Sequence, residues 1–308
     1  MGREFFDEFA AAREVFAAAD RVLGFALSRI IFEGPESELT LTANAQPAIL
    51  TVSYAIWQVL APFVPPQEVA AFAGHSLGEF TALVAAEALD FADAVRLVHH
   101  RGRFMQEAVP VGAGKMAAVV GLAREKIERV IASITSESEP VQLANINSPQ
   151  QIVISGSAAA VDAAKEPLVS AGAKRVIELK VSAPFHSVLM QPAAEKLRPL
   201  LESTSFKRPA APVYANATAA PYPEDASACA ALLTQQITSP VRWVETVEAM
   251  VRNREVQLAL EVGPGRVLRG LISKIDRTLP TANVGTVEDF KKLLPRLVGE
   301  EEVPANLR

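Results

Sequence analysis

The chain has 308 residues, a formal net charge of −5 and no long basic run, which argues against nucleic acid and anionic membranes as partners. Its residues are 50% apolar, enough for one large domain, or for a large domain with a smaller insert. No segment approaches the roughly eighteen unbroken apolar residues of a membrane span, and the N-terminus lacks a signal-peptide pattern. Cys229 is the only cysteine, which excludes an intrachain disulfide and a cysteine-based metal cluster and fits a reducing cytoplasm.

The first hundred residues predict helices around one short strand. Phenylalanines and Val15 recur among charges and alanines near the N-terminus, as in an amphipathic helix, and Asp90 is the predicted N-cap of a later one. A short apolar run ends at Gly74 and helix formers follow, which predicts a strand, a tight turn and a helix. The predicted helices cover residues 3–19, 45–61, 77–88 and 90–105, and the predicted strand covers residues 68–73.

Residues 112–182 have a different pattern. Strand and helix signals follow one another as β-α-β-β-α-β, the order of a ferredoxin-like subdomain. A length of about seventy residues suits a compact insert. The predicted strands cover residues 115–122, 141–147, 151–155 and 175–181, and the predicted helices cover residues 124–134 and 158–171.

Strands and helices alternate again after Pro184. This alternation on both sides of the insert predicts a mostly parallel sheet covered by helices. The tail after about Asp289 predicts no definite element. The predicted helices cover residues 189–203, 226–237, 241–253 and 267–275, and the predicted strands cover residues 213–215 and 256–261.

Gly74-His75-Ser76-Leu77-Gly78 matches the G-x-S-x-G pattern between a predicted strand and helix, the context of a nucleophile elbow. In such a sharp turn, side chains beside the serine would collide with neighbouring backbone, which we take as the reason for both glycines. The turn exposes the Ser76 hydroxyl and aims the Leu77 backbone N–H at an oxyanion. Ser76 is therefore the candidate nucleophile, and Leu77 the candidate oxyanion donor.

A serine nucleophile needs a base, and the chain contains four histidines. His75 adjoins the serine, but successive residues in a tight elbow point apart, so packing or hydrogen bonding beneath the turn is expected. His99 and His100 lie late in a helix among arginines, where a helix-end or solvated role is expected. His186 lies in a loop that enters a helix, where triad histidines usually sit, and by elimination it is the candidate base. We find no acid in the chain order of a hydrolase triad, which makes a Ser-His dyad oriented by another group plausible.

Five motifs resemble, in order and spacing, the acyltransferase family of fatty acid and polyketide synthesis, which includes the malonyl-CoA:acyl-carrier-protein transacylases. The resemblance covers residues 1 to about 280. It implies an α/β-hydrolase-like large domain with a parallel sheet (residues 1–111 and 183–290), an inserted ferredoxin-like subdomain (residues 112–182) and a C-terminal tail (residues 291–308). The motifs are Gly74-His75-Ser76-Leu77-Gly78-Glu79-Phe80, Arg101-Gly102-Arg103-Phe104-Met105-Gln106, Asn145-Ile146-Asn147-Ser148-Pro149, Ser182-Ala183-Pro184-Phe185-His186 and Glu261-Val262-Gly263-Pro264-Gly265.

The resemblance implies a role for each matching residue. Ser76 would be the nucleophile and His186 the general base, oriented by the backbone carbonyl of Gln236 in place of an acid. Arg101 matches the arginine that holds the malonyl carboxylate, which a planar guanidinium can grip with two parallel hydrogen bonds. Asn145 matches an asparagine on the insert side of the cleft and is an expected substrate contact.

Residues next to the serine and histidine bear on substrate selectivity. Phe185 and Leu77 resemble the malonyl-selective members, whereas methylmalonyl-selective domains more often carry serine and glutamine at these places. A bulky Phe185 would narrow the pocket around substrate C2, and we group His75 with Phe185 among the substrate-binding residues. The resemblance implies malonyl transfer from malonyl-CoA to the phosphopantetheine thiol of an acyl carrier protein, by a ping-pong mechanism through malonyl-Ser76.

For the whole protein the resemblance implies a cytoplasmic enzyme of fatty acid or polyketide synthesis. We expect a monomer with no permanently bound cofactor, no metal, and no nucleic-acid or membrane partner. Basic residues on one side of the last clear helix are either a docking surface for the carrier protein or a solvated face; they are Arg266, Arg269, Lys274 and Arg277.

The chain departs from the family at its N-terminus. Members normally begin with a strand and a Pro-Gly-Gln-Gly-Ser-Gln loop that supplies a second oxyanion N–H, and Met1-Gly2-Arg3 aligns just after it. We therefore expect the chain as written to lack one oxyanion donor, a loss that typically lowers the rate about a hundred- to a thousandfold. Two alternatives stay open: a serine esterase or thioesterase that shares the elbow, and an inactive, N-terminally truncated paralogue.

Overall fold

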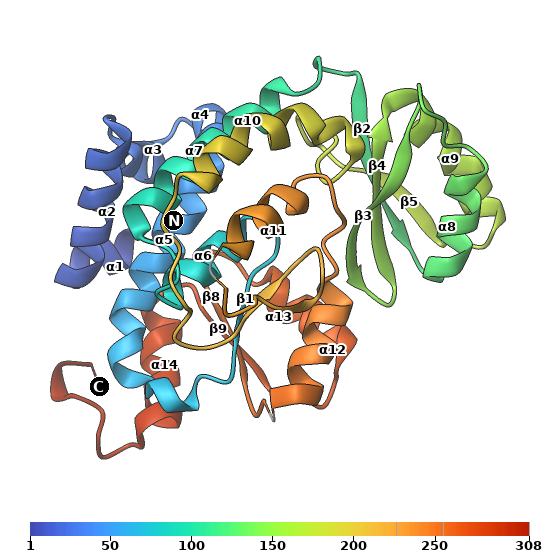
Figure 1. The fold of residues 1–308 in the computed structure, drawn as a ribbon. Coiled ribbons are helices and arrows are strands. Elements are labelled where there is room, and N and C mark those ends of the chain that lie inside the picture. The colour runs from blue at the N-terminus through green and yellow to red at the C-terminus, as the bar shows by residue number, and fades with distance from the viewer. Residues whose placement is uncertain (226, 255, 308) are drawn as a thin grey trace. The chain divides into compact units, whose positions relative to one another are not determined.

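The computed structural model describes residues 1–225, 227–254 and 256–307, and it has a mixed α/β fold (Figure 1). The chain forms two compact units: Met1–His99, Phe206–Val213 and Met250–Arg308 make the first, and His100–Ser205 and Tyr214–Ala249 make the second. In the described ranges, no helix is both long enough and apolar enough to cross a membrane. The predicted domain bounds at residues 112 and 183 and the predicted tail remain predictions.

The first unit consists mainly of helices with short strands. Its helices are α1 (Arg3–Glu8), α2 (Ala10–Leu23), α3 (Leu27–Glu33), α4 (Glu36–Leu39), α5 (Thr42–Leu60), α6 (Leu77–Ala85), α13 (Val267–Ile275) and α14 (Val287–Val298). The strands are β1 (Phe72–Ala73), β8 (Ala259–Val262) and β9 (Thr281–Val284), and the 3-10 helices are η1 (Ala61–Phe63), η2 (Pro66–Glu68) and η4 (Ala305–Leu307). Helix α7 (Phe91–Glu107) begins in this unit, and Asp90 caps it as predicted, accepting the Ala92 N–H at 2.8 Å.

Helix α5 lies at the centre of the first unit and contacts α2, α6 and β8. Strands β8 and β9 are parallel, and both contact α13. The predicted N-terminal helix is wrong in one respect, because extended backbone at Phe9 (φ −117°, ψ 126°) separates α1 from α2. The ring of Phe9 packs 5.7 Å from the rings of Phe5 and Phe290, so the break places an aromatic side chain against α14.

Other elements of the first unit also differ from the sequence prediction, which has no helix at the positions of α3 and α4. Strand β1 is much shorter than the predicted run 68–73, because Pro66 begins a 3-10 helix in front of it. Strand β9 was not predicted. Helix α14 was not predicted either; Thr286 and Asp289 form a capping box at its start, and its buried side chains are Val287, Phe290, Leu293 and Leu294.

The second unit contains an antiparallel sheet with strand order β3-β4-β2-β5. Helices α8 and α9 pack on one face of this sheet (Figure 1), and the elements follow the predicted order β-α-β-β-α-β. Apolar side chains of both helices and of β2, β3 and β4 form one buried cluster, which holds the sheet and the helices together. The bounds are β2 (Gly114–Val120), α8 (Arg124–Ala132), β3 (Val141–Ser148), β4 (Gln151–Ser157), α9 (Ala158–Ser170) and β5 (Arg175–Glu178).

The remaining elements of the second unit follow the sheet. A hairpin of β6 and β7 pairs Tyr214 with Pro221, and residue 226, where a predicted helix was to begin, lies outside the described residues. The bounds are η3 (Val188–Met190), α10 (Gln191–Glu202), β6 (Val213–Ala215), β7 (Ala220–Pro221), α11 (Ala228–Gln236) and α12 (Trp243–Arg254), of which β6 and α12 have one end in the first unit.

Candidate active site

Ser76 lies at a strained turn between β1 and α6. Its backbone has φ 52° and ψ −105°, in a region that residues other than glycine rarely adopt and that is common at functional sites. A Cβ atom on Gly74 would lie 1.9 Å from the carbonyl oxygen of Gly78, so only glycine fits at position 74. The same expectation for Gly78 is wrong, because a Cβ there would meet nothing within 4 Å. The elbow therefore needs glycine at position 74, where the chain passes close to the backbone of Gly78, and not at position 78.

Leu77 is the first residue of α6, and the first N–H groups of a helix have no intrahelical acceptor. The next two N–H groups, of Gly78 and Glu79, bond to the carbonyls of His75 and Ser76 at 2.9 and 3.1 Å. The Leu77 N–H thus lies at the positive end of the α6 dipole, where negative charge is stabilised. His75 is half-buried in the turn, and its backbone carbonyl accepts the Gly78 N–H.

His186 is buried in the second unit and has a left-handed backbone with φ 57°. Its Nδ1 lies 2.9 Å from the backbone carbonyl oxygen of Gln236, the last residue of α11. A carbonyl oxygen can only accept, so Nδ1 carries the proton and Nε2 is the basic nitrogen of the neutral ring. The structure therefore brings His186 together with the predicted orienting carbonyl.

The side chain of Gln236 makes a second contact that the sequence did not predict. Arg101, on α7, donates a hydrogen bond of 2.9 Å from Nη2 to Oε1 of Gln236, and both side chains are at most 2% exposed. A buried guanidinium is stable only where acceptors surround it, and the amide oxygen of Gln236 is one such acceptor. Gln236 therefore contacts Arg101 through its side chain and His186 through its backbone.

Asn145 and Phe185 lie beside the antiparallel sheet. Asn145 is buried in β3, opposite Val153, where the register of β3 against β4 shifts. The Phe185 ring is partly buried against the cluster of Met116, Ala118, Ala144 and Val153. Asn145 and Phe185, two of the predicted substrate-binding residues, therefore lie at the same part of the sheet, because Phe185 packs against the cluster that contains Ala144 and Val153, which neighbour Asn145.

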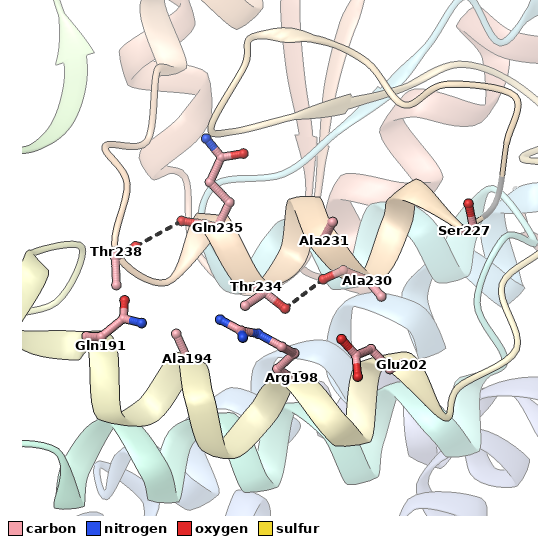
Figure 2. Close-up of a pocket in the computed structure, with 10 residues that line it drawn as sticks. All are labelled: Gln191, Ala194, Arg198, Glu202, Ser227, Ala230, Ala231, Thr234, Gln235 and Thr238. Atoms are coloured by element: carbon pink, nitrogen blue, oxygen red, sulfur yellow. Dashed lines mark hydrogen bonds between the residues drawn. The ribbon is translucent and has the colours of Figure 1, made fainter.

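A groove of about 500 Å³ lies between α10 and α11, as Figure 2 shows. Arg198 and Glu202 project into it from α10, and Ala230 and Thr234 line it on α11. None of the predicted site residues lines it, although Gln235 and Thr238 on either side of Gln236 do. The buried hydrogen bonds of His186 and Arg101 therefore lie outside the lining of this groove.

Two further features bear on cofactors and partners. In the part of the chain that the structure describes, no group of three or more His, Cys, Asp or Glu side chains could hold a metal ion. On the predicted basic face of α13, Arg266 pairs with Asp289 at 3.3 Å and Arg269 donates to Asn283 at 3.1 Å. These two arginines thus have partners within the first unit.

The acyl transferase domain model matches residues 1–291. A malonyl CoA-acyl carrier protein transacylase of Bacillus subtilis is 46% identical over 303 residues, which is 98% of this chain and 94% of the relative. This chain belongs to the malonyl CoA-acyl carrier protein transacylase family. The acyl-carrier-protein S-malonyltransferase of Bartonella henselae has a similar structure, with a TM-score of 0.91 at 43% identity over 96% of this chain and 94% of that one. A malonyl-transacylase in complex with a type II PKS acyl-carrier protein matches with a TM-score of 0.90 at 41% identity, over 96% and 94% of the two chains.

In this member of the transacylase family, the motif Glu261-Val262-Gly263-Pro264-Gly265 has a structural role. The Glu261 carboxylate accepts the backbone N–H groups of Leu268 and Arg269, at 3.1 and 2.7 Å, in the first turn of α13. Gly263 has φ 137°, and a Cβ there would lie 2.3 Å from Oγ of Ser53 on α5. The motif thus caps one helix and lets the chain pass close to another.

Proposed function

We propose that this chain transfers a malonyl group from malonyl-CoA to the phosphopantetheine thiol of an acyl carrier protein, through an ester on Ser76. The observation that carries the proposal is the buried pair of contacts at Gln236, which join a candidate base and a candidate carboxylate-binding arginine. Family membership over nearly the full chain supports the same chemistry for fatty acid biosynthesis. Whether the chain also serves polyketide synthesis depends on the carrier protein that it meets.

In the first half-reaction, Nε2 of His186 takes the proton of the Ser76 hydroxyl while the serine oxygen bonds to the thioester carbonyl carbon. The Leu77 N–H stabilises the oxyanion, the carbon–sulfur bond breaks, and coenzyme A leaves with the proton from His186. In the second half-reaction, the carrier thiol gives its proton to His186 and attacks the malonyl ester. The carbon–oxygen bond then breaks, and Ser76 recovers its proton.

Three residues select the acyl group in this proposal. Arg101 holds the carboxylate of the malonyl group, while Asn145 and Phe185 contact the rest of it, with Phe185 limiting the space at C2. His75 supports the turn beside the substrate. Because nucleophile, base and oxyanion donor are protein groups, the reaction needs no permanently bound cofactor or metal. We also propose a cytoplasmic monomer, with the acyl carrier protein as its macromolecular partner.

The proposal includes a finer description of the fold. Residues 112–182 would form a ferredoxin-like subdomain inserted into an α/β-hydrolase-like domain of residues 1–111 and 183–290. The antiparallel order β3-β4-β2-β5 supports the first part, and the parallel pair β8-β9 and the turn at Ser76 support the second.

Intact-mass spectrometry after incubation with malonyl-CoA tests the function. The wild-type protein should gain the mass of one malonyl group, and adding an acyl carrier protein should move that mass to the carrier. Ser76→Ala should gain nothing, and an adduct that persisted on this variant would exclude Ser76 as the nucleophile. Release of free malonate without transfer to the carrier would instead indicate an esterase or thioesterase.

A further inference from the structure

Gln142 makes three hydrogen bonds to the backbone of two separate segments. Its Nε2 donates to the carbonyl oxygen of His186 at 3.2 Å and to that of Thr238 at 3.1 Å. Its Oε1 accepts the backbone N–H of Val188 at 3.0 Å. A primary amide has two donor hydrogens and one acceptor oxygen, so this side chain uses both kinds of group on these segments.

One of these segments carries the candidate base, and the other follows the residue whose carbonyl orients its ring. One contains His186 itself, whose left-handed backbone is held on one side by the Gln142 bonds to its own carbonyl and to the Val188 N–H. The other contains Thr238, two residues after Gln236, whose carbonyl accepts from Nδ1 of the His186 ring. Gln142 therefore ties the backbone that carries the imidazole to the backbone that orients it.

The strand that carries Gln142 also fixes the second segment directly. The Val241 N–H donates to the carbonyl of Ala144 and the Ile146 N–H donates to the carbonyl of Val241, both at 2.8 Å. These bonds form a short parallel bridge between β3 and the chain just after Thr238. Strand β3 thus holds the segment after Gln236 by backbone hydrogen bonds, and the Gln142 side chain of the same strand holds the backbone at His186.

We infer that Gln142 is a positioning residue for His186, which rests on the proposed role of His186 as the base that activates Ser76. Gln142 acts through two segments of backbone and not by contact with the acyl group. Without it, the His186 backbone loses both tethers to β3, and the ring explores orientations in which Nε2 is misaligned. A misplacement of about 1 Å lowers a reaction rate up to roughly a hundredfold.

Two variants separate this role from simple packing. Gln142→Met has a similar length but can make none of the three bonds, whereas Gln142→Glu keeps the shape and the acceptor for Val188 but turns a carboxylate toward two carbonyls. Gln151→Met, on the neighbouring strand β4, is the matched control, since the Gln151 side chain takes no part in the three hydrogen bonds of Gln142. Thermal melting of each variant identifies a temperature at which all are folded.

Two reactions are measured at that temperature. One is labelling of Ser76 by a fluorophosphonate, which needs an activated serine but neither a carboxylate nor a carrier protein. The other is malonyl transfer as a function of pH. We expect Gln142→Met to slow labelling and to lower kcat about ten- to a hundredfold with little change in KM. Gln142→Glu should lose at least as much, and Gln151→Met should match wild type.

The pH–rate profile separates positioning from loss of folded protein. In Gln142→Met, the acidic limb should move to lower pH, because a loosened Nδ1 bond no longer favours the charged ring. Loss of folded protein would lower the rate equally at every pH. Wild-type labelling rates and an unmoved acidic limb in both Gln142 variants would overturn the inference.

The fluorophosphonate result keeps the two proposals distinguishable. If wild type labels but transfers no malonyl group, the proposed function fails, while slower labelling of Gln142→Met still supports the positioning role. If wild-type Ser76 does not label at all, the inference about Gln142 fails as well.

Discussion

The amide oxygen of Gln236 accepts a 2.9 Å hydrogen bond from the guanidinium of Arg101. Through its backbone carbonyl the same residue accepts from the ring of His186, also at 2.9 Å. Any residue at position 236 keeps the backbone contact, but few keep the side-chain contact. Substitution of Gln236 therefore separates carboxylate recognition from orientation of the base.

The first prediction concerns Gln236→Met. Loss of a hydrogen bond to a charged group costs about 1.5–3 kcal/mol, so kcat/KM for malonyl-CoA should fall roughly tenfold to a hundredfold. Acetyl transfer, which needs no carboxylate contact, should change little. Steady-state kinetics with both acyl-CoAs measure the difference, and the exposed neighbour Gln235→Met is the control. An equal loss with both substrates would mean that Gln236 acts on the base alone.

The second prediction concerns Arg101 itself. Arg101→Ala should depress the rate at which malonyl-CoA acylates Ser76 by about a hundredfold or more, and far more than the rate with acetyl-CoA. Arg101→Lys keeps the charge but loses the two-pronged geometry, so its malonyl rate should lie between those of wild type and Arg101→Ala. Time-resolved intact-mass measurements give all these rates. An equal loss of acylation rate with malonyl-CoA and acetyl-CoA would show that Arg101 has no role in carboxylate recognition.

The third prediction compares the two glycines of the elbow. A Cβ at position 74 would lie 1.9 Å from backbone, whereas a Cβ at position 78 meets nothing within 4 Å. Gly74→Ala should therefore unfold at a clearly lower temperature and lose activity. Gly78→Ala should be at least as stable as wild type, because alanine favours a helix over glycine by about 1 kcal/mol. Thermal melts of the two variants test this contrast, and equal destabilisation of both would contradict it.

The fourth prediction concerns a surface network of Lys115, Asp162, Lys165 and Glu178, which joins β2, α9 and β5. The hydrogen bond from Lys165 is the main cause of the lowered pKa of the Glu178 carboxyl; desolvation opposes it, and the hydrogen bond from Lys115 lowers the pKa further. A carboxylate with a lowered pKa stabilises the fold above its unfolded-state pKa, and this contribution is lost as the pH falls through the folded-state value. The stabilisation should therefore be complete near neutral pH and disappear in acid.

Urea unfolding of Glu178→Gln measures this contribution. The exposed Glu166→Gln on α9 is the control. Near neutral pH and at low salt, Glu178→Gln should have the lower midpoint. The gap between the two variants should close below about pH 4, and also in roughly 1 M salt, which screens exposed charges. A gap that is independent of pH would assign the loss to packing rather than charge.

Local patterns predicted most of the second unit. Helix α8 and strand β3 begin at the predicted residues 124 and 141, because alternating and helical apolar periods mark their buried faces. Strand β9 is short and follows an irregular stretch, so no period was visible. The break at Phe9 could not be predicted either, since its partner Phe290 is distant in the sequence.

The candidate site shows the same division. The motifs named Ser76, His186, Arg101 and the Gln236 carbonyl, and the structure adds the contact of Arg101 with the Gln236 side chain. Gln142 stands in an ordinary strand pattern, and its bonds reach backbone groups 44 and 96 residues away. A single sequence carries no signal for such contacts, because any strand residue of that type would look the same.

The bridge between Val241 and β3 allows local opening near His186 to be followed by hydrogen exchange. The amide protons of Ile146 and Val241 are both sequestered in that bridge, so one local opening releases both to solvent. The same opening frees the segment that begins at Gln236 and deprives His186 of its fixed acceptor. Exchange of these two amides in the second unit thus reports the free energy of the opening that would misplace His186, the candidate base.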